Sequence, residues 1–312
     1  MLPQTTPNDV SGSHPTPDIT QFPMSDESHT AVPPPPLPAP APIPSVKPVS
    51  KIRWGIHLAL MASLPLIAGF AGASSRGNGP ALSHTAGGML IACAVELLFF
   101  AIPFGLAWLA SRANKDDLLL RWRPGYWVVP LGAVYSFAIR MGAGIVTLIV
   151  AGIAMAVTRA SKADVEHFVQ EHQPQVEKLV DVHAMSASPA YFWLSLILVS
   201  FVIGGLREEL WRSSFLAGLR SIWPRAFGSQ GGGIAAAAVA ALFFGLGHLP
   251  QGILAAAMIT VVGFLLGVIM TLHRSVWPSV LAHGFFDATS LALLPWAMQL
   301  KEELQKMQHL GG

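Results

Sequence analysis

The sequence predicts an all-α membrane protein, a polytopic bundle of about seven to eight transmembrane helices. The chain of 312 residues is 52% hydrophobic and only 12% charged, whereas about a quarter of the residues in a soluble domain carry a charge. Its apolar residues also gather into long runs, and a helix needs about 20 of them in succession to cross a bilayer. Composition and run length therefore exclude an ordinary soluble protein.

Seven runs have the length and composition of a membrane-spanning helix. They cover residues 54–73, 85–110, 126–157, 190–206, 233–248, 251–272 and 277–298. The run 126–157 is long enough for one tilted helix or for two helices divided near residues 140–144, and the second alternative gives an eighth span. Residues 208–219 are expected to continue the fourth helix and to end near Trp223 and Pro224, because proline does not continue a helix easily.

Residues 1–50 differ in composition from the rest of the chain. They hold 14 of its 25 prolines and few clusters of apolar residues, and such a segment cannot bury enough surface to offset the entropy of ordering it. We predict a disordered, Pro-rich tail over 1–50, partly polyproline II, and a multi-pass membrane domain over 51–312. No apolar run of signal-peptide length follows Met1, so the tail is not expected to be a cleaved secretory signal.

A polar stretch over residues 160–188 interrupts the apolar runs. Apolar residues recur in it at rough helical spacing on a charged background, at Val165, Phe168, Val169, Val176, Leu179 and Val180. This pattern predicts an amphipathic helix that lies at the membrane interface. The histidines of this stretch, His167, His172 and His183, are interpreted as solvated surface residues.

The basic residues predict how the chain is oriented in the membrane. Lys and Arg gather before the first run, between the second and third, and after the fourth, while fewer lie in the opposite loops. Because cytoplasmic loops carry the excess of Lys and Arg, we expect the N-terminus and the acids at 208–209 on the cytoplasmic side of a plasma (inner) membrane, provided that 126–157 crosses once. The charges are scattered between apolar runs, so no nucleic-acid partner is expected.

Ionisable residues inside apolar runs are expensive at membrane depth and are functional candidates by default. Glu96 in the second run and Arg140 in the third are interpreted as a structural ion pair between helices. His57 and His84 lie near the ends of runs and are interpreted as interfacial residues. The remaining candidates form three motifs toward the C-terminus.

The first motif is an acid pair, Glu208 and Glu209, at the end of the fourth run. Arg212 follows Glu208 by four residues, so the two share a helix face and the cation would keep a carboxylate ionised. Adjacent helical residues point about 100° apart, so one acid is expected to do the chemistry and the other to position or support it. A juxtamembrane charge cluster that marks the helix end is the alternative.

The second and third motifs each contain a histidine. His248 follows Phe244 by one helical turn, and this ring could wall a dry pocket around the imidazole, although a lone histidine here could equally cap the helix. His283 and Asp287 are four residues apart and share a face, so the carboxyl group can orient the imidazole by accepting its second N–H. A structural hydrogen bond between helices is the alternative for this pair.

Together the motifs supply what a hydrolase needs, in two alternative ways. In the first, a carboxylate activates water, one imidazole positions it, and the second imidazole with its neighbour stabilises the oxyanion. In the second, Glu208, His248 and His283 hold one metal ion, with Zn²⁺ as a candidate, whose bound water becomes acidic. Both interpretations use the same residues, so both stay open at this stage.

In their order and spacing these motifs resemble those of the CPBP intramembrane proteases, the family of the CAAX prenyl endopeptidases and the bacterial Abi-type proteins. The family pattern is Glu-Glu-x-x-x-Arg, then Phe-x-x-x-His, then His-x-x-x-Asn or Asp, on separate membrane helices. Phe244/His248 and His283/Asp287 match it without adjustment. Arg212 departs from it, because it stands one position closer to the acids than the family arginine.

The resemblance covers a protease-like core at about residues 190–298 and implies an intramembrane endopeptidase that uses a Glu-activated water. It also implies a peptide or protein substrate, lipidated in the CAAX case, that is reached within the lipid bilayer. The implied catalytic residues are Glu208, Glu209, His248, His283 and Asp287, with Arg212 and Phe244 in support. The rival hypothesis is a non-catalytic membrane scaffold or immunity-type protein that binds a peptide or partner in the same cavity, and the displaced Arg212 favours it.

Overall fold

The computed structural model describes residues 50–74, 82–159, 161, 163–164, 167 and 180–310. The chain divides before Pro48, and everything described belongs to the second unit, Pro48–Gly312. The predicted tail at 1–50 lies outside the described residues except for Ser50. Most of the predicted amphipathic helix at 160–188 also lies outside them, and the described part of that stretch includes the short helix α5 (Val182–Ala187).

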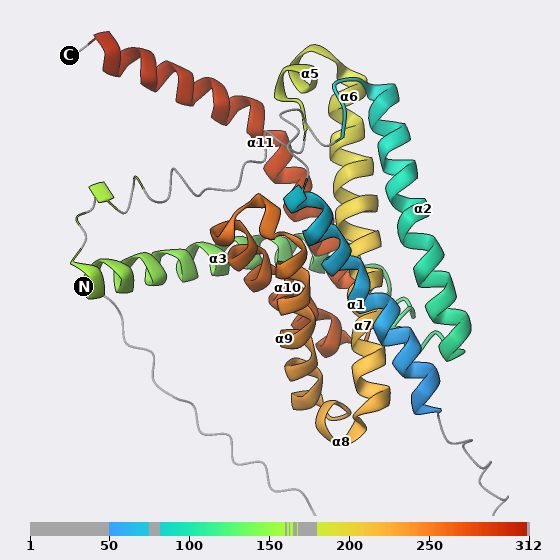
Figure 1. Cartoon of the computed structure of the whole chain (residues 1–312). Helices are drawn as coiled ribbons and strands as arrows, with labels where there is room; N and C mark the ends of the chain where they lie inside the picture. The colour runs from blue at the N-terminus through green and yellow to red at the C-terminus, as the bar shows by residue number, and fades with distance from the viewer. Residues whose placement is uncertain are drawn as a thin grey trace, which may run out of the picture. The chain divides into compact units, whose positions relative to one another are not determined.

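The described residues form helices and no strands (Figure 1). In chain order these are α1 (Lys51–Ser74), α2 (Ala86–Ser111), η1 (Gly125–Trp127), α3 (Val128–Thr158), α5, α6 (Pro189–Leu194), η3 (Ser195–Arg207), α7 (Glu208–Ile222), α8 (Pro224–Phe227), α9 (Gln230–Gly247), η4 (Leu249–Gln251), α10 (Ile253–His273) and α11 (Trp277–Leu310). The predicted all-α, polytopic bundle is confirmed.

Six helical segments of the described residues are long and apolar enough to cross a membrane, and they coincide with the first six predicted runs. The seventh run, 277–298, forms the first part of α11, which packs along η3 and α3. It is not among the six, because polar residues such as His283 and Asp287 lower its mean hydropathy. Helix α3 is continuous from Val128 to Thr158, so the alternative of a break near residues 140–144, and with it the eighth span, is wrong.

The segment that carries the acid pair is one continuous helical rod made of α6, η3 and α7. It begins where the Ser188 side chain accepts a backbone N–H of the first turn, and Pro189 occupies the first helical position. Its middle part, η3, is a π-helix, a form that often occurs at functional sites. The rod ends just before Trp223, which confirms the predicted continuation over 208–219.

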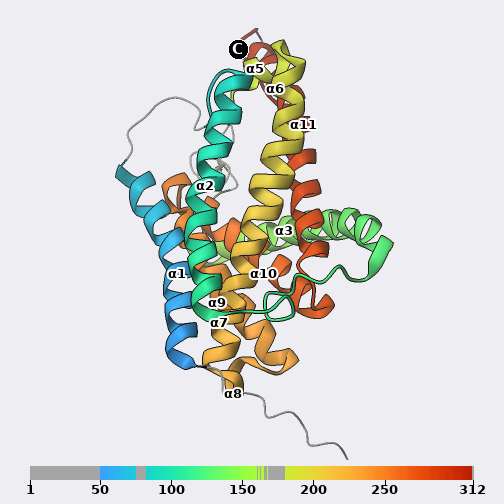
Figure 2. The ribbon, with the colours of Figure 1, turned by 90° about the vertical axis from the view of Figure 1, so that its right-hand side faces the viewer.

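Glycines let η3 and α11 approach each other closely. A Cβ atom on Gly205 would lie 2.8 Å from the carbonyl oxygen of Val280, and one on Gly204 would collide with the Asp287 carboxylate. Small residues are the usual means by which membrane helices pack at short range. Helix α11 accordingly runs alongside η3 (Figure 2), which brings its polar residues within reach of the acids that open α7.

Replacing Gly205 by Ala is expected to destabilise the protein by about 1–3 kcal/mol, because the added methyl group forces η3 and α11 apart. Gly105→Ala is the matched control, since Gly105 also lies in a membrane helix but a Cβ there meets none of the described residues within 4 Å. The apparent unfolding temperature of each variant in nanodiscs measures the difference. Equal stability of the two variants would contradict the close packing at Gly205.

The interpretation of His57 as an interfacial residue is wrong, because His57 is fully buried between α1, α2 and α7. Its Nδ1 lies 3.0 Å from the carbonyl oxygen of Ala107 and 3.0 Å from the Ser111 hydroxyl, and its Nε2 lies 2.8 Å from the Ser214 hydroxyl. Nε2 also lies 3.0 Å from the carbonyl oxygen of Ser214, so each ring nitrogen faces a carbonyl oxygen and a hydroxyl group. This network ties α7, the helix of the acids, to the two N-terminal helices.

The predicted ion pair between Glu96 and Arg140 is also wrong. Arg140 donates to α11, where the carbonyl oxygen of Phe286 lies 2.8 Å away and two hydroxyl groups lie close by. Glu96 instead accepts a hydrogen bond from Arg207 over 2.8 Å. The reason is helix placement, since α3 packs against α10 and α11 whereas α2 packs against α1 and η3.

Candidate active site

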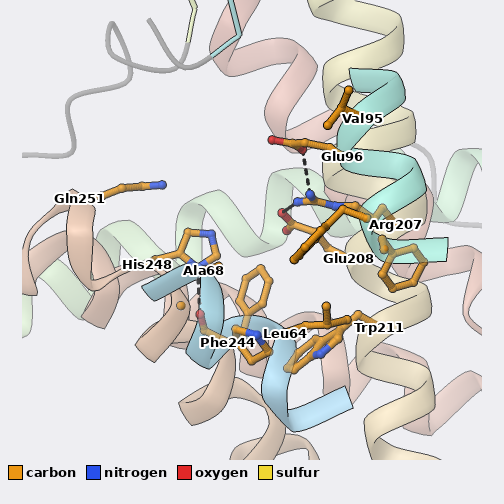
Figure 3. Close-up of a pocket in the computed structure, with 14 residues that line it drawn as sticks. Leu64, Ala68, Val95, Glu96, Arg207, Glu208, Trp211, Phe244, His248 and Gln251 are labelled. Atoms are coloured by element: carbon orange, nitrogen blue, oxygen red, sulfur yellow. Dashed lines mark hydrogen bonds and ion pairs between the residues drawn. The ribbon is translucent and has the colours of Figure 1, made fainter. Parts of the chain in front are cut away.

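The acid pair and His283 meet directly, and the motif of His248 shares a cavity with Glu208. Glu208 and Glu209 open α7, and the His283 ring on α11 lies 3.7 Å from the first carboxylate and 3.0 Å from the second. His248 follows the last residue of α9 and lines the same cavity as Glu208 (Figure 3). The fold therefore gathers residues from α7, α9 and α11 into one region.

Glu209 is the buried acid of the pair. Its Oε1 accepts hydrogen bonds from Nη1 of Arg212 and, over 3.0 Å, from Nδ1 of His283. Arg212 is fully buried as well, and its guanidinium carbon lies 4.7 Å from the centre of the Phe244 ring, within the range of a cation–π contact. A glycine of α10 makes room for this side chain, since a Cβ on Gly263 would lie 3.3 Å from Nη2.

The displaced arginine of the first motif still reaches the acid pair. Arg212 follows Glu209 by three residues in α7, and residues at that spacing are neighbours on a helix surface. The two side chains therefore form an ion pair although the sequence spacing differs from the family pattern. The shift in position does not remove the guanidinium from the site.

His283 is held mainly by Glu209. Its Nδ1–H donates to that carboxylate, a tautomer that follows from the acceptor it faces. Its Nε2 lies 3.5 Å from Asp287 and 3.7 Å from Glu208, and both distances exceed those of a good hydrogen bond. Glu209 thus orients His283, the role that was predicted for Asp287.

Glu208 is the acid that faces open space. Its side chain is 16% exposed and lines a cavity of about 400 Å³. The lining residues are Leu64, Pro65, Ala68, Val95, Glu96, Phe99, Phe100, Arg207, Glu208, Trp211, Phe244, Gly247, His248 and Gln251. Apolar walls with a few convergent polar groups are typical of a ligand-binding cavity. His283 and Asp287 are not among these residues, so His283 approaches Glu208 from α11 without lining the cavity.

His248 is fixed by its own helix. Its Nδ1 donates to the carbonyl oxygen of Phe244 over 2.8 Å, which leaves Nε2 as the acceptor of a neutral ring. The Phe244 and His248 rings lie 4.6 Å apart between centroids, so the predicted aromatic wall is present. Figure 3 shows His248 and Glu208 on opposite sides of the cavity.

Two further residues of the cavity were not expected at the site. Arg207 donates through Nη2 to Oε1 of Glu208 over 2.9 Å and through Nη1 to Oε2 of Glu96 over 2.8 Å (Figure 3). Consecutive helical residues do not face each other, so the spacing of Arg207 and Glu208 gave no reason to expect the first contact. The contact with α2 depends on how two distant helices pack, which no local pattern in the sequence reports.

The predicted metal ligands are not assembled as a metal site. Within the described part of the chain, no three His, Cys, Asp or Glu side chains are grouped so that they could hold a metal ion. His283 contacts the acids from α11, whereas His248 lies on the far side of the cavity from Glu208. The donor set therefore does not fit a bound Zn²⁺ in this arrangement.

Comparison with known proteins supports the motifs. Residues 189–289 match the family described as Rce1-like, the type II CAAX prenyl endopeptidase Rce1-like proteins. The matched segment begins at α6 and ends within α11, and it includes all three motifs. No curated protein and no solved structure matches the chain.

Proposed function

Since this chain belongs to the CPBP family of CAAX-type intramembrane proteases through residues 189–289, we propose that it is an endopeptidase whose catalytic base is Glu208. The observation that carries the proposal is that Glu208 and His248 line one cavity from two different helices. Glu209 is fully buried and paired with Arg212. Glu208 is therefore the acid of the pair with access to water and substrate.

The proposed reaction uses Glu208 as the base and His248 as its partner across the cavity. Glu208 takes one proton from water while the water oxygen bonds to the carbonyl carbon of the substrate. The second hydrogen stays on that oxygen, and Nε2 of His248 accepts a hydrogen bond from it. The tetrahedral intermediate then breaks its C–N bond, and Glu208 returns the proton to the leaving nitrogen. The products are a carboxylic acid and an amine. Glu209, Arg212, His283 and Asp287 do not line the cavity and are proposed to support Glu208. Stabilisation of the oxyanion by His283 and Asp287 stays a prediction.

The cavity walls support an apolar, membrane-borne substrate. Most of the side chains that line it are aliphatic or aromatic and come from α1, α2, α7 and α9. Such walls suit an apolar segment or a lipid group attached to a peptide. The proposed substrate is thus a peptide or protein, lipidated as in CAAX processing, that enters from the bilayer. The proposed location is a plasma (inner) membrane with the N-terminus cytoplasmic, because of the distribution of Lys and Arg.

The rival proposal of a non-catalytic scaffold loses its main support. It relied on the displaced Arg212, and that residue contacts Glu209 in spite of the shift. A scaffold also has no need for an acid and an imidazole that share an open cavity. We therefore retain proteolysis as the proposed function.

The first test is hydrolysis of a quenched-fluorescent prenylated peptide by the purified protein in nanodiscs, with and without a strong chelator. We expect cleavage in both arms, because the described residues do not assemble three metal ligands. Activity that the chelator removes and Zn²⁺ restores would overturn the metal-free mechanism. No cleavage of the prenylated peptide or of an unprenylated control would count against peptidase activity and in favour of the scaffold.

A further inference from the structure

Arg207 lies between two carboxylates on the wall of the cavity. Its Nη1 donates to Oε2 of Glu96 over 2.8 Å, and its Nη2 donates to Oε1 of Glu208 over 2.9 Å. The side chains of Arg207, Glu96 and Glu208 are 24%, 41% and 16% exposed. This cluster is therefore accessible from the cavity, unlike the fully buried pair of Glu209 and Arg212.

Each acid of the pair has its own guanidinium group. Arg212 is engaged by Glu209, whereas Arg207 is the cation in hydrogen-bond contact with Glu208. His283 also faces Glu208, and its Nε2 lies 3.7 Å away and thus beyond hydrogen-bond length. A carboxylate in apolar surroundings needs such a partner to remain charged. Arg207 is the residue placed to supply it.

The contact also selects one oxygen of Glu208. Arg207 occupies Oε1, whereas Oε2 lies 3.7 Å from Nε2 of His283, beyond the length of a hydrogen bond, and is the oxygen that can take a proton from water. We propose that Arg207 is a positioning residue, which holds Glu208 ionised and turned toward water, and that Glu96 of α2 holds Arg207 in place. The catalytic part of this inference rests on the proposed function, whereas the ionisation of Glu208 can be measured without a substrate.

Glu96 matters because an arginine side chain is long and has several rotatable bonds. Without its second carboxylate, Arg207 would be free to turn into the cavity, and a charge-assisted hydrogen bond on each side limits that movement. Supporting residues of this kind orient the groups that do the chemistry. Glu96 lies outside the matched segment 189–289. Through Glu96, the N-terminal half of the chain therefore contributes a positioning residue to the proposed site.

Infrared difference spectroscopy tests the ionisation directly. The bands of Glu208 are those that disappear in Glu208→Gln, and at neutral pH we expect a carboxylate band in the wild-type protein. Arg207→Gln is expected to convert it to the band of a protonated carboxyl group, whereas Arg207→Lys keeps the carboxylate because it keeps the charge. A carboxylate band that persists in Arg207→Gln would overturn the inference, whatever the activity of the protein.

Kinetics test the arrangement of the two residues. We expect kcat to fall by roughly 100-fold in Arg207→Gln and by roughly 10-fold in Glu96→Gln with KM little changed, the range for residues that orient a reacting group. The double variant should be no slower than Arg207→Gln alone, because Glu96 acts only through Arg207. Glu303→Gln and Arg123→Gln are controls, since both residues are exposed.

Two kinetic results would contradict the arrangement. Losses that multiply in the double variant would mean that Glu96 acts independently of Arg207, and a change confined to KM would make the pair part of substrate binding. If the wild-type protein cleaves no peptide, the proposed function fails, and the infrared bands still decide whether Arg207 keeps Glu208 ionised. The apparent unfolding temperature of each variant shows whether it is folded. If Arg207→Gln does not fold, Arg207→Lys is measured in its place.

Discussion

Glu208→Gln is expected to lower kcat for peptide hydrolysis by roughly 10²- to 10⁴-fold, with KM and stability close to those of the wild-type protein. A glutamine cannot take the proton of water, and general base catalysis supplies a factor of this size. The side chains have nearly the same shape, and Glu208 is partly exposed to the cavity, so the amide finds partners there. The measurement is the steady-state cleavage of the prenylated peptide in nanodiscs.

Glu209→Gln separates the two roles within the acid pair. Because Glu209 is fully buried against Arg212, this change is expected to lower the unfolding temperature more than Glu208→Gln does. Glu303→Gln, in an exposed part of α11, controls for the loss of a carboxylate as such. An active Glu208→Gln together with a folded but inactive Glu209→Gln would exchange the roles proposed for the two acids.

The helices could be predicted well from the sequence because their signals are local. A run of apolar residues reports the length of a membrane helix without any knowledge of its neighbours, and six of the predicted runs are recovered. Helix α11 shows the limit of that signal. The polar residues that make it part of the site, His283 and Asp287, are also those that lower its hydropathy. In this helix, the residues that belong to the site are therefore also the residues that hide the helix from a hydropathy criterion.

The sequence predicted which motifs gather at the site, but it did not predict every partner of the charged residues. The spacing of Glu208, Glu209 and Arg212 limits which side chains can meet along α7, and the observed pair is one of those neighbours. The link from Arg207 to Glu96 joins residues that are 111 positions apart. Glu96 was therefore matched with the wrong arginine, since a buried charge indicates that a partner exists but not which one it is.

Arg212→Met is expected to destabilise the protein by about 3 kcal/mol or more. Removal of one partner from a buried ion pair leaves the other as an uncompensated charge, and such changes typically cost about 3–5 kcal/mol. His283 remains as a hydrogen-bond donor to Glu209, so the loss should lie near the lower end of that range. Arg225→Met is the control, because Arg225 is exposed on α8. Denaturant titration in mixed micelles gives both free energies of unfolding.

The double variant Glu209→Gln/Arg212→Met decides whether the loss comes from the stranded charge. Arg212 Nε and Nη2 and Glu209 Oε2 are buried without a hydrogen-bond partner among the described residues, and each such atom costs free energy. Removal of both charges also removes the two unpaired nitrogens of Arg212, so the double variant should recover much of the stability lost in Arg212→Met. If the two single losses simply add, the ion pair is not the source of the effect, and the packing of Arg212 against Phe244 is.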